Sequence, residues 1–115
     1  MARISVLDMT FNKVYSALLG KVERKGRSRS ELDEVTSWLT GYTRKQIEEA
    51  MTSDITYGSF FSDCPSYNPR SELIKGKVCG IAVEEIEDPL MKRIRQLDKL
   101  ADELAKGKAM EDVLR

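Results

Sequence analysis

Cysteine and acidic side chains are the residues in this sequence that could carry covalent or metal chemistry. The chain of 115 residues has no histidine, which excludes Ser-His-Asp and Cys-His catalysis and most zinc sites. Its two cysteines, Cys64 and Cys79, supply only two soft metal ligands. Free cysteine behaves as a small hydrophobic residue, so we expect two free, packed thiols. A reactive Cys64 would need a nearby cation, which its sequence neighbours do not show.

Acidic residues gather at Glu84, Glu85, Glu87 and Asp88. If this stretch is helical, Glu84 and Asp88 share one face and could serve a carboxylate-dependent enzyme or bind a divalent metal. The alternative is that the acids place a cap and negative charge at the start of a helix beginning at Pro89. We favour the cap, because one physical cause explains every acid. With no phosphate loop or dinucleotide fingerprint either, the sequence predicts no catalytic residue, no metal ligand and no cofactor.

Aromatic residues and prolines concentrate in the less regular stretch 53–80. Loops on a rigid scaffold often carry binding sites. The candidate ligand or interaction surface consists of residues from this stretch together with two acids of the run above: Tyr57, Phe60, Phe61, Cys64, Tyr67, Glu84 and Asp88. The alternative, which we favour, is that Phe60 and Phe61 cover one end of the core while Tyr57 and Tyr67 are half-buried, because aromatic side chains dominate core energetics.

A helix-turn-helix-like segment over residues 31–51 offers a nucleic-acid hypothesis, because a short turn at Thr40-Gly41-Tyr42 joins two predicted helices. The candidate nucleic-acid contacts are Lys21, Arg24, Lys25, Arg27, Arg29, Arg44 and Lys45. Glu48 and Glu49 would repel phosphates on the second helix. Lysine plus arginine equals aspartate plus glutamate at 19 each, so no global field favours nucleic acid. We therefore favour an ordinary helical hairpin with a solvated basic corner.

The elements that must position these residues are mainly helices. Apolar residues recur every three or four positions within 11–25, 30–40 and 89–106, and shorter helices are predicted after Thr43, Thr56 and Asn68. Ser28 with Glu31, or Ser30 with Asp33, could cap the second helix. We predict an all-α fold, a compact multi-helix globular domain spanning residues 1–115. Periodicity does not decide whether residues 76–86 add one short minor β pair or form a loop that turns into a helix.

The helix predicted over 89–106 carries the most regular apolar stripe, formed by Leu90, Ile94, Leu97, Ala101 and Leu104. The stripe covers only about two heptads, fewer than the three or four that indicate a coiled coil. It is a candidate seam for a homodimer, although packing within its own domain is the favoured interpretation.

No apolar run approaches the ~18 residues of a membrane span, and the first residues do not form a signal peptide. We therefore expect a soluble cytoplasmic protein with no membrane partner. Its other partners are unknown from sequence.

Several motifs together resemble a bacterial family known as domain of unknown function 2200. They are Lys25-Gly26-Arg27, Trp38-Leu39-Thr40-Gly41-Tyr42, Val78-Cys79-Gly80, the segment 83–91 and the segment from Leu97 to Arg115. Ala82 stands where a larger polar residue is expected. The resemblance implies a compact, mainly helical bacterial protein with no established activity, cofactor or partner, and it supplies no catalytic residues. The leading functional hypothesis is a small non-enzymatic binding or interaction protein.

Overall fold

The protein is mainly helical in this computed structural model, which describes residues 6–78 and 80–115. The helices are η1 (Val6–Asp8), α1 (Phe11–Arg24), α2 (Arg29–Thr40), α3 (Arg44–Met51), α4 (Tyr57–Ser62), η2 (Pro69–Leu73), η3 (Val83–Glu85), α5 (Pro89–Ala105) and α6 (Met110–Val113), where η marks a 3-10 helix. The antiparallel strands β1 (Lys77–Val78) and β2 (Ile81–Ala82) pair Val78 with Ile81. The predicted all-α fold is confirmed, and of the alternatives left open for residues 76–86 the structure has the short β pair.

Local capping side chains define where α2 and α3 begin. The Ser28 side chain accepts a hydrogen bond from the Glu31 backbone N–H, and the Glu31 carboxylate accepts one from the Ser28 backbone N–H. Thr43 and Gln46 form the same reciprocal arrangement at α3. Each pair satisfies two backbone donors that the first helical turn leaves without intrahelical partners. Of the two serines that could cap α2, the one used is Ser28.

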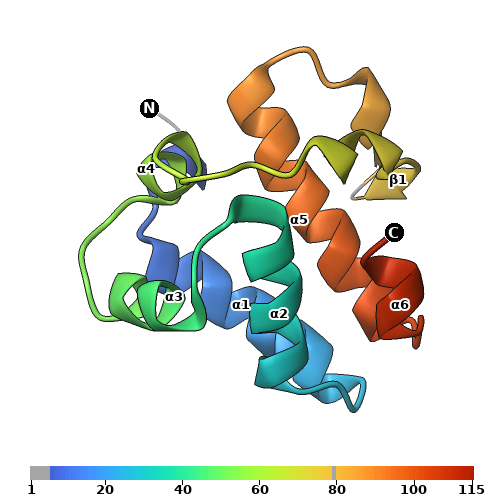
Figure 1. Ribbon diagram of the computed structural model, residues 1–115, viewed down its shortest axis with the longest axis horizontal. Coiled ribbons are helices and arrows are strands. Elements are labelled where there is room, and N and C mark those ends of the chain that lie inside the picture. Colours follow the sequence, from blue (N-terminus) through green and yellow to red (C-terminus); the bar gives the residue numbers. More distant parts are fainter. Residues whose placement is uncertain (1–5, 79) are drawn as a thin grey trace.

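Helix α5 forms the centre of the core. It runs through the molecule in Figure 1, with the hairpin and α6 near one end of the longest axis and α3 and α4 near the other. Ile94, Leu97, Ala101 and Leu104 of its apolar stripe are fully buried within this single chain. The helix packs against α1, α2 and α4. The apolar stripe that was a candidate homodimer seam is therefore buried in the chain's own core.

The residues between α4 and α5, numbers 63–88, form an irregular segment that we call the α4–α5 connection. Its first part lies against the carboxyl end of α2, where Ser66 N donates to Thr40 O at 3.1 Å and Asn68 N donates to Leu39 O at 2.9 Å. The Asn68 side chain also donates to Trp38 O at 3.0 Å. The last carbonyls of a helix lack intrahelical partners, so these bonds both complete α2 and fix the start of the connection.

Candidate functional site

Three aromatic candidates lie inside the core. Tyr57 and Phe61 are fully buried, and Phe60 is 1% exposed. The burial of Phe60 and Phe61 agrees with the favoured core interpretation, whereas the expectation that Tyr57 is half-buried is wrong. The start of α4 is tied to the segment before α1, since Tyr57 N donates to Met9 O at 2.7 Å, and this places the Tyr57 ring in the interior. None of the three can contribute to an exposed interaction surface.

Arg93 of α5 gathers two of the remaining candidates. Its guanidinium donates to Phe61 O at 2.8 Å and to the Cys64 sulfur at 3.3 Å. It also lies 4.3 Å from the centre of the Tyr67 ring, which is a cation–π contact. Because Phe61 belongs to the last turn of α4, its carbonyl has no intrahelical partner and the arginine supplies one. The contacts of Arg93 therefore fasten the beginning of the α4–α5 connection, just after α4, to α5.

Gln96 makes a second attachment one turn along α5. The Tyr67 hydroxyl donates to the Gln96 side-chain oxygen. The Gln96 amide donates in turn to Ser71 O at 3.3 Å. Gln96 is 3% exposed, so this polar side chain is buried with its hydrogen bonds made within the chain. Sequence reasoning missed both Arg93 and Gln96, because their partners lie 25 to 32 residues away and no local motif indicates the pairing.

The Cys64 thiol is free and partly exposed, and Cys79 lies outside the described residues. Burial raises the pKa of the Cys64 thiol above its usual value, and the neighbouring Arg93 only partly offsets this effect. The thiolate is the nucleophilic form, so a raised pKa keeps Cys64 protonated and weakly reactive at neutral pH. The arginine therefore serves packing and hydrogen bonding here without producing an activated cysteine.

We expect folded Cys64 to react with iodoacetamide at pH 8 more slowly than the same residue in the urea-unfolded chain, because the folded site both raises its pKa and restricts access. Peptide mass analysis after a short pulse assigns the label to Cys64 or Cys79. Faster labelling of Cys64 in the folded protein would contradict the protonated, packed thiol described above.

The two acidic candidates do not share a helix face. Asp88 is the N-cap of α5 and accepts hydrogen bonds from Leu90 N at 2.9 Å and Met91 N at 3.2 Å. Glu84 belongs to the separate helix η3, and its carboxylate accepts from Gly76 N at 3.0 Å. The favoured capping interpretation is confirmed for Asp88, and the alternative of one helix carrying both acids is wrong. The α-helix starts only at Pro89, because Asp88 is held extended as its cap.

Neither a metal cluster nor a membrane span is found within the described ranges 6–78 and 80–115. No three cysteine or acidic side chains there lie close enough to hold a metal ion together. In the same ranges, every helix is too short or too polar to cross a lipid bilayer.

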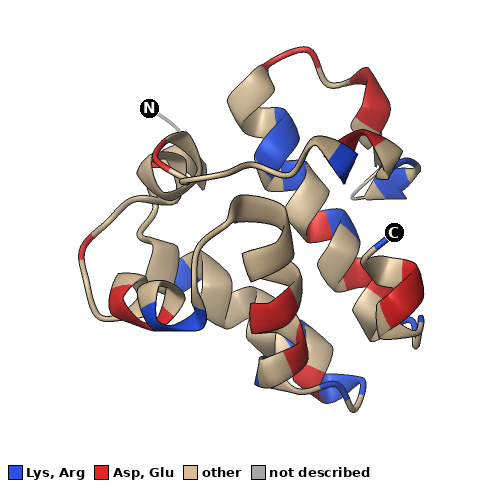
Figure 2. Ribbon diagram, in the orientation of Figure 1, with Lys and Arg blue, Asp and Glu red and all other residues tan. Residues whose placement is uncertain are grey.

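The basic corner that suggested nucleic-acid binding is largely neutralised within the chain. Figure 2 shows acidic and basic segments interleaved along the helices. The ion pairs of this corner are Lys21–Asp102 at 3.3 Å, Arg27–Glu31 at 2.8 Å, Arg29–Asp33 at 3.4 Å and Arg44–Glu34 at 3.9 Å. Arg24, Lys25 and Lys45 are exposed, as are the acids Glu48 and Glu49 on α3. The corner therefore presents mixed charge, which gives phosphates little net attraction.

Two aliphatic side chains that sequence reasoning did not single out are the most exposed large hydrophobic groups of the described residues. Leu73 at the end of η2 is 51% exposed, and Ile81 of β2 is 43% exposed. Both belong to the α4–α5 connection. Alternation of exposed and buried residues could not have identified Ile81, because the ladder in which it pairs with the buried Val78 is two residues long and too short to carry a periodic pattern.

These features define a mainly helical protein with one apolar core cluster and an irregular connection fastened to its central helix. The chain belongs to the family described as "Uncharacterized protein conserved in bacteria (DUF2200)", which it matches over residues 5–115. The resemblance seen in its sequence motifs is thereby confirmed.

One solved structure is very similar along nearly the whole chain. It is the crystal structure of uncharacterized protein SP1917, with 49% sequence identity and a TM-score of 0.92. The similarity covers 98% of this chain and 94% of that chain. No curated protein matches the sequence. The relatives therefore establish the family and the fold, and the function must be argued from the surface.

Proposed function

We propose that this is a non-enzymatic cytoplasmic protein that binds a partner protein through Leu73 and Ile81 of the α4–α5 connection. The observation that carries the proposal is the exposure of these two side chains, 51% and 43%, on one irregular segment. Burying a fully exposed leucine or isoleucine side chain contributes about 1.5–3 kcal/mol, so a partner that covered the exposed half of each side chain here would gain about half of that at each position.

The connection is held in place close to both exposed side chains. The carbonyl of Leu73 itself accepts a hydrogen bond from Arg115 at 3.3 Å, and the carbonyl of Ser71 accepts one from Gln96. Lys99 of α5 donates to the carbonyl of Lys77 at 3.4 Å, within β1, the strand that pairs with β2. A segment that is already ordered loses less conformational entropy on binding. These attachments therefore favour a preorganised backbone at Leu73 and in the hairpin that carries Ile81.

Protein is the partner class that suits this surface. Aliphatic side chains among mixed charges match the composition of ordinary protein interfaces, in which an apolar centre is surrounded by a polar rim. Nucleic acid would require uncompensated cations, and the basic corner around α1 and α2 has paired most of its cations internally.

Site-specific photo-crosslinking in bacterial cells that contain the native partner tests the proposal. A photoreactive amino acid is placed at position 73, at position 81, or at the exposed Glu48 of α3 as the control. We expect positions 73 and 81 to give the same discrete crosslinked product, and position 48 not to give it. With the probe at 73, Ile81→Asp should reduce the product while leaving the circular dichroism melting curve unchanged.

Absence of a product at both positions, or an equal product at position 48, would contradict a partner site on the connection. Catalytic turnover of a metabolite by the purified protein, retained in the variant Leu73→Asp/Ile81→Asp, would contradict the non-enzymatic part of the proposal.

A further inference from the structure

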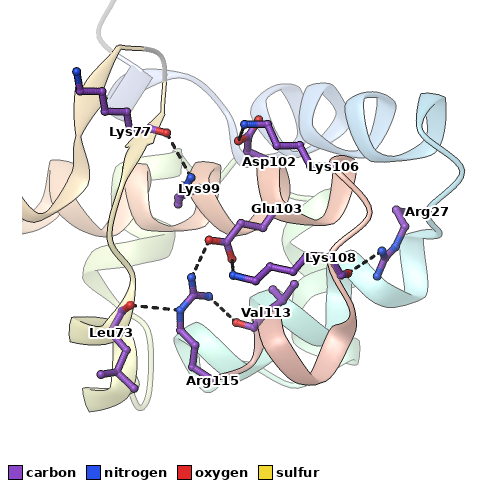
Figure 3. A network of polar contacts seen from close by, with 10 residues as sticks. All are labelled: Arg27, Leu73, Lys77, Lys99, Asp102, Glu103, Lys106, Lys108, Val113 and Arg115. Carbon is purple, nitrogen blue, oxygen red and sulfur yellow. Dashed lines mark hydrogen bonds and ion pairs between the residues drawn. The ribbon is translucent and has the colours of Figure 1, made fainter.

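Arg115 joins three separate elements through one guanidinium group. It donates to Leu73 O of η2 at 3.3 Å, to Val113 O of α6 at 2.8 Å, and to the Glu103 carboxylate of α5 at 2.6 Å. Figure 3 shows the guanidinium between these groups. The planar fork of arginine allows several donors to be used at once, which a lysine ammonium cannot do with the same geometry.

We call residues 108–115 the strap. Hydrogen bonds fasten the strap to the rest of the protein at both of its ends. Arg27 donates to Lys108 O at 2.8 Å, and the Lys108 ammonium lies 3.6 Å from the second oxygen of Glu103 (Figure 3). At the other end, Arg70 of η2 donates to Arg115 O at 2.6 Å. The strap and η2 are therefore joined by two arginines: Arg115 of the strap donates to η2, and Arg70 of η2 donates to the strap.

The contacts of the strap contribute less to the free energy of unfolding than the contacts of the core do. Val113 is the strap's one fully buried apolar side chain, and Met110 and Leu114 are partly buried against the core. Helix α6 has four residues, which is far below the length at which a helix persists by itself. Glu103 is 7% exposed, and its Oε1 atom makes no hydrogen bond within the described ranges. The cost of desolvating a buried charge largely offsets the attraction of its partners, so the closed strap gains little net stability from this ion pair.

Gly107 lies where the strap could swing away from α5. Its φ of +90° is favourable for glycine, and no atom lies within 4 Å of the place where a Cβ would stand. The preceding helix is completed without the strap's side chains, because Gly107 N donates to Leu104 O and Lys108 N donates to Glu103 O. Movement beyond residue 108 would therefore leave the end of α5 intact.

We propose that residues 109–115, the part of the strap beyond Lys108, act as a conformational latch that opens as one unit while α1, α2 and α5 stay folded, and that closes by clamping η2 through Arg115. Opening returns Glu103 to water and separates Leu73 O from its donor. Local openings of this kind lie below global unfolding in free energy wherever few apolar contacts must be broken. The latch follows from these contacts alone and does not rest on the proposed binding function.

Native-state amide hydrogen exchange of the full chain tests the latch. In Arg115→Ala we expect faster exchange, by the same factor, at two places. They are the amides of Val113 and its neighbour Leu114 at the end of α6, and those of Ser71 in η2 and Ile74 just after it. That factor should be about tenfold or more, because without the guanidinium the closed strap leaves the Glu103 carboxylate buried with only the Lys108 ammonium nearby, whereas the open strap returns it to water. The α1 amides should keep their rates. Arg115→Lys should give an intermediate acceleration, because it retains the charge opposite Glu103 and loses the fork.

Arg44→Ala is the matched control, since Arg44 also forms an ion pair but is 56% exposed and lies on α3. It should leave the exchange of both α6 and η2 unchanged. Equal acceleration of α1 in Arg115→Ala would show that the strap unfolds only with the whole protein. Acceleration of α6 without η2, or of neither, would show that Arg115 does not clamp the two together. Each of these three results would overturn the latch.

Discussion

Replacing Gly41 with alanine is expected to lower the free energy of unfolding by about 3 kcal/mol, the sum of a left-handed backbone cost of about 1–2 kcal/mol and a packing cost of about 1–3 kcal/mol. Gly41 ends α2 with φ +83°. A Cβ at this position would lie 2.9 Å from the Ser66 backbone N and O and from its Cβ. Backbone cannot move aside as a flexible side chain can. The substitution should therefore displace the start of the α4–α5 connection and weaken the bond from Ser66 N to Thr40 O.

Gly26→Ala provides the matched control for this effect. Gly26 has the same φ of +83°, but no atom lies within 4 Å of its Cβ position. Its variant should lose only the backbone cost of about 1–2 kcal/mol. Urea denaturation of both variants measures the difference. Equal losses would show that the contact with Ser66 is not the cause.

The same substitution, tyrosine to phenylalanine, is expected to have opposite effects at Tyr15 and Tyr57. Both rings are fully buried. The Tyr15 hydroxyl donates to the Asp33 carboxylate at 2.6 Å and lies 3.1 Å from the Thr36 hydroxyl. The Tyr57 hydroxyl has no hydrogen-bond partner among the described residues. Burial raises the pKa of both phenols, so each hydroxyl stays neutral across the physiological range.

Tyr15→Phe should destabilise the protein by about 1.5–3 kcal/mol, because it removes a hydrogen bond to a charged group. Tyr57→Phe should stabilise it by about 1 kcal/mol or more, because it removes a desolvated hydroxyl that gains no bond in return. Thermal and urea unfolding of the two variants measure the sign directly. A destabilised Tyr57→Phe variant would mean that this hydroxyl does have a partner in solution.

Features of the fold that depend on neighbours in sequence were predictable. Thr43, Thr56 and Asp88 cap helices as expected, because a cap needs only a side-chain oxygen two or three residues before the donor. The stripe on α5 was predictable for a similar reason, since helical periodicity alone places its members on one face. Its burial in the chain's own core, in preference to a dimer, required the structure.

The candidate site depended on contacts between distant residues, and most of it was not predictable. Arg93 meets Cys64 across 29 residues, and Arg115 meets Leu73 across 42. Nothing in the local sequence of an arginine shows which distant carbonyl it will satisfy. Tyr57 was predicted to be half-buried but is fully buried, for the same reason: the bond from its backbone to Met9 joins two segments far apart in sequence. Glu84 was misplaced because residues 83–85 form a separate 3-10 turn.

The affinity of the purified crosslinking partner for the wild type and for Leu73→Ser/Ile81→Ser tests most directly whether function resides on the connection. Glu48→Ser serves as the surface control. Isothermal titration should show at least about tenfold weaker binding by the double variant, since losing part of two buried aliphatic contacts exceeds 1.4 kcal/mol. The control should bind as the wild type does. Equal affinity of all three proteins would contradict a binding surface at Leu73 and Ile81.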